Sequence, residues 1–208
     1  MNKQTGFTLI ELAIVLVIIG LLLGGVLRGQ ELINSAKVKN MANDFRSIPV
    51  YIYGYQDKFK ALPGDDAAAV GHVAATTPGN GNGAIEGDWN AQDPAKESVL
   101  FWQHVRLAGL ATGSTTLPAA GASPFYPTNS DGGRIGVSGV NPITGLPGAY
   151  FMCSGGILGK FAKQLDTTID DGTPNGGSFR ASSTAQGSAN EAALAYVDNT
   201  AYTVCTGF

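Results

Sequence analysis

Residues 7–27 read FTLIELAIVLVIIGLLLGGVL, and Glu11 is the only charged residue among them. An α-helix rises about 1.5 Å per residue, so this segment spans about 30 Å, which matches the hydrocarbon core of a bilayer. We therefore predict one transmembrane helix over 7–27. A carboxylate inside the bilayer costs about 2.5 to 3.5 kcal/mol on insertion scales. Glu11 therefore needs a charge partner or a route to the headgroups.

A short polar segment, residues 1–6, precedes the apolar run and ends at Gly6. A secretory signal is cleaved after its apolar segment, next to small residues, whereas the small residue Gly6 stands before it. Cleavage after Gly6 leaves the apolar segment in place. Lys3 ahead of the span favours a cytoplasmic N-terminus with the large C-terminal part outside, although Arg28 and two lysines beyond the span weaken this asymmetry.

The residues from Gly6 to Glu11, followed by the unbroken apolar run, resemble the start of type IV prepilins and of type II secretion pseudopilins. In that family a membrane-embedded prepilin peptidase cuts after the glycine and methylates the new N-terminal residue. The resemblance implies a leader peptide over 1–6 and methylation of Phe7. It also implies that Glu11 pairs with the N-terminal ammonium of a neighbouring subunit, which fits the cost of an unpaired carboxylate in lipid. The alternative is a plain anchor whose Glu11 reaches the headgroups and favours the positive helix end.

Beyond the span, apolar residues recur mostly at steps of three or four, which is typical of one face of a helix. They are Ile33, Ala36, Met41, Phe45, Ile48, Ile52, Tyr55 and Phe59. We predict an amphipathic continuation of the helix over 28–61, ended by Leu62-Pro63-Gly64-Asp65. Residues 62–208 suffice for one globular head. The predicted class is α+β and, by the resemblance, pilin-like: a long helix packed on a loop-rich head with a small antiparallel sheet.

Within the head, residues Glu97 to Leu110 are expected to form a helix, with Asp93 as N-cap and Pro94 in its first turn. Residues Gly156 to Ile169 have helical spacing as well. Aromatic and β-branched content predicts three strands, over 134–140, 149–153 and 201–204.

Cys153 and Cys205 are the only cysteines of the chain. Thiols oxidise outside the cytoplasm, so a head on that side favours a disulfide between them. By the chain-entropy model, such a bridge contributes about 4 kcal/mol to stability. The alternative is a pair of buried free thiols.

Two stretches carry hard oxygen ligands of the kind that calcium prefers. The weak candidates are Asn80, Asn82 and Asp88 in the first stretch, and Asp170 and Asp171, beside Asp166, in the second. The first stretch departs from the EF-hand pattern at several positions. Solvated turns are the simpler interpretation of both stretches, and no other cofactor is expected.

The sequence carries no Walker loop, zinc-protease helix or nucleophile elbow. His72 and His104 are the only histidines, and His104 beside Trp102 in an apolar helix is expected to be a packed residue rather than a general base. A net charge of -3 and a pI near 5.3 disfavour bulk binding of nucleic acid. We therefore predict that the protein is not an enzyme.

These features predict a structural subunit of a type IV pilus or a pilus-like filament, held in the bacterial inner membrane with its head in the periplasm. The expected partners are the prepilin peptidase, homologous subunits in a helical filament and the inner-membrane assembly platform. A type II secretion pseudopilin is one alternative. A minor tip pilin or adhesin, with residues 112–131 as its contact loop, is another. Arg28, where many pilins have proline, leaves this choice open.

Overall fold

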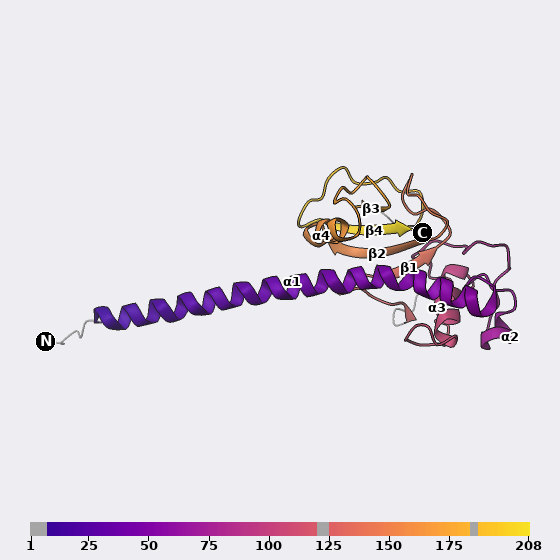
Figure 1. Ribbon diagram of the computed structural model, residues 1–208, viewed down its shortest axis with the longest axis horizontal. Helices are drawn as coiled ribbons and strands as arrows, with labels where there is room; N and C mark the ends of the chain where they lie inside the picture. The colour runs from indigo at the N-terminus through magenta and orange to yellow at the C-terminus, as the bar shows by residue number, and fades with distance from the viewer. Residues whose placement is uncertain (1–7, 120–124, 184–186) are drawn as a thin grey trace. The chain divides into compact units, whose positions relative to one another are not determined.

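The computed structural model describes residues 8–119, 125–183 and 187–208. Gly6 and Phe7, and residues 120–124 of the candidate contact loop, lie outside the described residues. The elements in chain order, shown in Figure 1, are α1 (Leu9–Phe59), α2 (Ala69–Val73), α3 (Glu97–Leu107), β1 (Ile135–Ser138), β2 (Phe151–Leu158), α4 (Gly159–Ile169), β3 (Phe179–Ser182) and β4 (Ala201–Gly207). This α+β arrangement confirms the predicted fold class. By its internal contacts the chain forms an N-terminal unit, Met1–Lys37, and a C-terminal unit, Val38–Phe208. The domain boundaries inferred from the sequence stay predictions.

One stripe of α1 is buried within the C-terminal unit. Its members are Val38, Met41, Ala42, Phe45, Ile48, Ile52 and Tyr55. The stripe has the predicted helical spacing but starts later than predicted, because Ile33 and Ala36 are exposed, and Phe59 is only partly buried. The helix also ends two residues before the predicted bound, since Lys60 takes a left-handed backbone conformation with φ of 55°.

The four strands form one antiparallel sheet in the order β1-β2-β4-β3. The aromatic ring of Phe45 on α1 contacts that of Phe179 on β3, with ring centroids 5.2 Å apart. The predicted strands at 134–140, 149–153 and 201–204 correspond to β1, β2 and β4, with shifted ends. Strand β3 was not predicted, because its four residues, Phe-Arg-Ala-Ser, are too short to show an alternating pattern.

The helix predicted over 156–169 is present as α4, which ends at Ile169 as expected, but its predicted start was wrong, because residues 156–158 belong to β2. The pairing of β2 with β4 is irregular between Ser154 and Ile157, where Gly156 has a φ of 71°. Such a bulge accommodates an extra residue and lets pairing resume at Ile157. Helix α4 then begins at Gly159.

Helix α3 was predicted correctly in place but is shorter than expected at its C-terminal end. Asp93 is not its N-cap, which is also a correction. The helix is preceded by Lys96, which makes no side-chain cap, and the Asp93 carboxylate accepts a bond from the backbone N–H of Ala95 at 2.9 Å. Asp93 and Pro94 therefore form a separate turn ahead of α3.

Both edges of the sheet are covered by loops of the same chain. On β1, the N–H of Ile135 donates to the carbonyl of Pro127 at 2.9 Å. On β3, the N–H of Ala181 donates to Pro174 and its carbonyl accepts from Ala193. Covered edges disfavour assembly by strand addition.

Candidate functional site

The N-terminal end of α1 is capped by the pair Thr8 and Glu11. The Glu11 atom Oε2 accepts the backbone N–H of Thr8 at 2.8 Å and its hydroxyl at 2.7 Å. The N–H of Glu11 donates back to the Thr8 hydroxyl at 3.3 Å. This reciprocal arrangement is a capping box, which satisfies amide groups that a helix start leaves unpaired. The capping box was not predicted, although its signature, Thr-x-x-Glu, is present in the sequence.

The capping bonds leave part of the Glu11 carboxylate available. The backbone N–H and the hydroxyl of Thr8 both donate to Oε2, whereas within the described residues Oε1 accepts no hydrogen bond. The Glu11 side chain is exposed on the surface of the N-terminal unit. The arrangement thus positions one carboxylate oxygen to receive a donor from another molecule.

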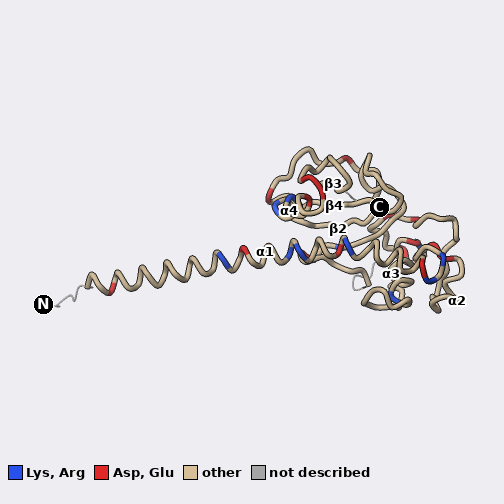
Figure 2. The backbone as a smooth tube through the Cα atoms, in the orientation of Figure 1, with Lys and Arg blue, Asp and Glu red and all other residues tan. Residues whose placement is uncertain are grey.

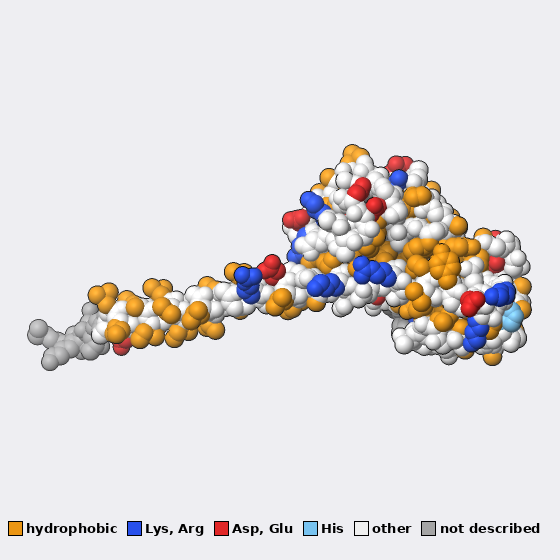
Figure 3. All heavy atoms as spheres, viewed as in Figure 1, with side chains coloured by type: hydrophobic (Ala, Val, Ile, Leu, Met, Phe, Trp, Pro, Cys, Tyr) orange, Lys and Arg blue, Asp and Glu red, His pale blue; other side chains and the backbone are white. Residues whose placement is uncertain are grey.

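Large apolar side chains cover the first part of α1 on all sides. They are Leu9, Ile10, Leu12, Ile14, Val15, Leu16, Val17, Ile18, Ile19, Leu21, Leu22, Leu23, Val26 and Leu27, all exposed. Figure 3 shows this surface in orange. Within the described residues, α1 is the one helix long and apolar enough to cross a membrane, judged by length and composition. Isolated in water, such a surface would be very unfavourable, so it requires lipid or other subunits around it.

Charged residues follow directly after the apolar run, beginning with Arg28. Arg28 lies 3.9 Å from Glu31 on the exposed helix surface, and further lysines and acids follow along α1, as Figure 2 shows. This change from apolar to charged residues is consistent with the end of a bilayer-spanning segment at residue 27.

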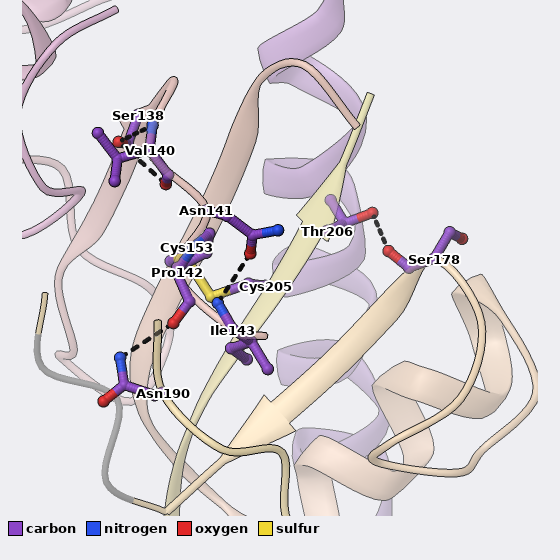
Figure 4. Close-up of a disulfide and its surroundings, with 10 residues drawn as sticks. All are labelled: Ser138, Val140, Asn141, Pro142, Ile143, Cys153, Ser178, Asn190, Cys205 and Thr206. Atoms are coloured by element: carbon purple, nitrogen blue, oxygen red, sulfur yellow. Dashed lines mark hydrogen bonds between the residues drawn. A yellow bond between two sulfur atoms is a disulfide. The ribbon is translucent and has the colours of Figure 1, made fainter. Parts of the chain in front are cut away.

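The predicted disulfide between Cys153 and Cys205 is present, and the described cysteines have no free thiol. The two residues are direct neighbours across β2 and β4, with Cα atoms 4.1 Å apart, and both are fully buried. Both cysteines lie inside strands that are longer than predicted, rather than at strand ends. Figure 4 shows the bridge beside Ile143, which is also fully buried. The bridge therefore joins the two central strands of the sheet.

The first calcium candidate is a loop whose backbone is held by a buried carboxylate. Asp65 accepts the N–H groups of Gly81 and Asn82 on Oδ1, at 2.7 and 3.0 Å, and that of Gly83 on Oδ2 at 2.8 Å. Asp65 lies six residues after the end of α1 at Phe59, and its side chain is buried, with 4 % exposed. Three converging amides stabilise its charge.

A second carboxylate, Glu97 at the start of α3, holds the same loop. Its Oε1 accepts the N–H of Asn80 and its Oε2 that of Glu86, each at 2.9 Å. Neither Asp65 nor Glu97 was predicted from the sequence to have this role. The available signal was the pair of aspartates directly after Pro63-Gly64, at a helix end followed by an amide-rich loop.

The amide candidates themselves bond within the loop. Asn80 and Asn82 both donate side-chain N–H groups to Glu86, at 3.1 and 2.8 Å, and Asp88 is only partly buried. In the second cluster, Asp170 accepts the N–H of Ser178 at 2.6 Å, and Asp171 accepts that of Thr173 at 2.8 Å. These partners account for the turns that both stretches form.

The described ranges contain no group of three or more His, Cys, Asp or Glu side chains placed to hold a metal ion. The structure therefore does not bring the candidates of either stretch together in such a group. Calcium binding stays a prediction from the sequence alone.

Asp166 lies at the centre of the second cluster, fully buried on α4. The hydroxyl of Tyr196 donates to its Oδ2 at 2.6 Å, and the N–H of Gly172 donates to its Oδ1 at 3.0 Å. Burial raises the pKa of Asp166, and the charges of Asp171 and Asp170 add to this effect. The carboxyl therefore holds the loop that follows α4 and the segment around Tyr196.

The raised pKa of Asp166 predicts how stability depends on pH. The folded protein retains a proton there at pH values at which the unfolded chain has released it, so stability should fall as pH rises from about 4 through the folded pKa. Asp166→Asn, which mimics the protonated side chain, should flatten this decline. Urea unfolding of the full chain in detergent at several pH values measures it. Asp57→Asn is the control, because Asp57 is an exposed acid on α1 whose partner is Lys60. Equal pH slopes in wild type and Asp166→Asn would contradict the prediction.

The two histidines have structural partners. His104 is fully buried, and its Nδ1 accepts the N–H of Gly64 at 3.0 Å, so it is a packed residue as predicted. Burial lowers the pKa of His104. His72 lies 2.7 Å from the buried carboxylate of Asp66, which also accepts the hydroxyl of Tyr55 at 2.7 Å. Although burial opposes it, bonds from His72 and Tyr55 lower the pKa of Asp66.

The candidate contact loop, residues 112–131, is tied to α3 over its described first part. The Arg106 guanidinium donates to the carbonyls of Thr112 at 3.1 Å and Ser114 at 3.0 Å. Gln103 donates to the carbonyl of Thr115 at 2.8 Å. These bonds hold residues 112–115 against α3, and within the described part of the loop nothing in the geometry names a ligand.

Comparison with known families gives one match. The family model described as "Prokaryotic N-terminal methylation motif" matches residues 1–27. No curated protein and no solved structure matches the chain. The matched residues include Gly6, Phe7 and the capped Glu11. The chain thus has a pilin-like α+β fold, and its first 27 residues carry the N-terminal methylation motif that is typical of type IV pilins and pseudopilins.

Proposed function

We propose that the protein is a structural subunit of a type IV pilus or a pilus-like filament, assembled through α1. The observation that carries this proposal is the methylation motif over 1–27, joined to a helix whose surface is apolar on all sides. Before assembly the apolar segment lies in the inner membrane, crossing it once, with the C-terminal unit in the periplasm. During assembly, neighbouring helices replace the lipid around it.

Glu11 has a defined part in this process. Its carboxylate is unfavourable in lipid, at about 2.5 to 3.5 kcal/mol on insertion scales. The capping box reduces that cost in the single subunit because it supplies two donors from Thr8. The remaining oxygen then accepts the N-terminal ammonium of a neighbouring subunit. Neither charge keeps its full hydration in lipid, so the pair is favourable only when the two groups meet directly, and this favours one register between subunits.

The processing step gives a direct test. Prepilin peptidase is expected to remove residues 1–6, so that the mature chain starts at Phe7 with a methylated amine. Mass spectrometry of the N-terminal peptide measures this. Gly6→Leu is expected to leave the precursor accumulating in the membrane, whereas Gly29→Leu, beyond the motif, should be processed normally. An intact Met1 in the wild-type protein, or cleavage beyond Leu27, would falsify the prepilin proposal.

The kind of filament is a separate question. A pilus subunit, a type II secretion pseudopilin and a minor tip subunit share the motif and the fold class. Deletion of the gene, scored for surface filaments, twitching, DNA uptake and protein secretion, separates a pilus from a secretion pseudopilus. Copy number in sheared filaments separates a major subunit, which is abundant, from a tip subunit, which is rare.

A further inference from the structure

Asp44 is an unpartnered carboxylate on the part of α1 that belongs to the C-terminal unit. It lies three residues from Met41 and four from Ile48, both buried, so it borders the buried stripe and is itself half-buried. Within the described residues, no hydrogen bond or ion pair ends on its side chain. Groups of this kind normally have a partner, because desolvation disfavours a charge that nothing compensates.

The environment of Asp44 already disfavours its charged form in the single subunit. Desolvation raises its pKa to about 6, and no neighbouring donor or cation opposes this shift. By contrast, the buried Asp66 and the loop-holding Asp65 each accept several bonds. Asp44 is thus a place where a cation from another molecule would offset the cost of desolvation.

Lys39 is the complementary group on the same segment. Its side chain is exposed, and no hydrogen bond or ion pair involves it within the described parts of the chain. Lys39 and Asp44 are five residues apart, which places them about 140° apart around the helix axis. They therefore face nearly opposite directions. A head-to-tail contact between identical subunits joins two different faces, because one face of each subunit contacts the subunit before it and the other face contacts the subunit after it.

The proposed register between subunits brings these two residues to nearly the same level. If the amine of Phe7 in one subunit meets Glu11 of the next, parallel copies are staggered by four residues, or about 6 Å. The same stagger along α1, which is one helix from Leu9 to Phe59, sets residue 40 of one copy beside Asp44 of the other. Lys39, one residue before residue 40, is the cation of α1 closest to Asp44 of the neighbouring copy in this register.

We propose that Asp44 of one subunit forms an ion pair with Lys39 of the neighbouring subunit, as a second charge contact in the same register as the one at Glu11. This inference rests on the proposed filament assembly. The partner is a second copy of this chain. The pair favours the correct stagger, because copies shifted along the axis would leave Asp44 without its cation.

Other nearby cations fit the geometry less well. Lys37 is seven residues from Asp44 and so lies on the same side of α1, about 20° away around the axis. It cannot approach Asp44 from the opposite face of a neighbour. Arg46 lies above the level that the stagger requires, and its guanidinium is 3.5 Å from the amide oxygen of Asn43.

Charge exchange tests the pair in cells whose only copy is the variant gene, with filaments sheared and measured by immunoblot. Asp44→Lys and Lys39→Asp are each expected to lower filament yield about tenfold, because each places like charges together. The double variant should restore most of the yield. Asp44→Asn should lower yield while leaving the unassembled protein at least as resistant to urea as wild type. Asp57→Lys is the control, since it removes only an exposed ion pair with Lys60.

Cross-linking gives a second readout that does not depend on yield. The double variant Asp44→Cys with Lys39→Cys should form a ladder of multimers on a non-reducing gel, because the native cysteines are already joined to each other. An intrachain bridge is disfavoured, since the two positions are about 7.5 Å apart along the helix and face away from each other. Asp44→Cys alone is the control and should give no ladder.

The outcomes separate this inference from the proposed function. Restored yield in the charge-exchange variant, or a cross-linked ladder confined to the double-cysteine variant, supports the pair. Wild-type filaments combined with no restoration and no ladder overturn it and leave the filament proposal standing. If the wild-type protein is not found in any sheared or periplasmic filament, the proposed function itself is wrong.

Discussion

Replacing Glu11 with leucine is expected to abolish filament assembly while insertion into the membrane and leader cleavage continue. The substitution removes the single charge of residues 7–27, so the subunit should insert at least as well as wild type. It also removes the proposed acceptor for the ammonium of the neighbouring subunit. The N-terminal turn loses its reciprocal bond with Thr8, which costs at most about 1 to 2 kcal/mol of local helix stability.

The measurement uses Glu11→Leu as the sole copy and compares two readouts. The amount of cleaved subunit in the membrane should match wild type, and sheared filaments or secretion should be lost. Glu31→Leu is the matched control, because Glu31 is an exposed acid on the same helix whose partner is Arg28. A plain membrane anchor predicts no difference between the two variants. Normal filament yield with Glu11→Leu would rule out the pairing role.

Loss of the disulfide has the second largest expected effect. Cys153→Ser should lower the free energy of unfolding by about 2 to 5 kcal/mol, since removing a native bridge from a small extracytoplasmic domain typically has this cost. The bridge closes a segment of 52 residues between the two central strands. Opening it restores conformational freedom to the unfolded chain, and it leaves Cys205 as a buried free thiol.

Urea unfolding of the full chain in detergent measures the change, and the amount of subunit in the cell should fall with it. Cys205→Ser and the double serine variant should resemble Cys153→Ser, because each removes the same bond. Wild-type protein treated with reductant is the matched control without a substitution. A change below about 1 kcal/mol in all of these would show that strand pairing, not the bridge, holds the sheet together.

Features that depend on neighbouring residues in the chain were predictable. The motif around Gly6, Phe7 and Glu11 is contiguous, and the stripe of α1 repeats over several turns, so both are visible without a structure. The bridge was predictable for a different reason, since a chain with two cysteines allows one pairing. Errors arose at element ends, where one residue decides: Lys60 stops α1 by its left-handed conformation, and Gly156 keeps β2 extended through a bulge.

The apolar span, the motif with its single carboxylate and the long amphipathic helix could all be predicted without a structure, because they rest on local periodicity and on transfer of side chains between water and lipid. Three features became visible once the chain was folded: Asp65 and Glu97 hold the loop around Asn80, Phe179 begins a strand, and Asp44 is half-buried with no partner among the described residues. Each of these joins residues far apart in the chain or depends on what packs over a helix flank. Burial and hydrogen bonding are set by the packed neighbours, and a linear pattern does not contain them.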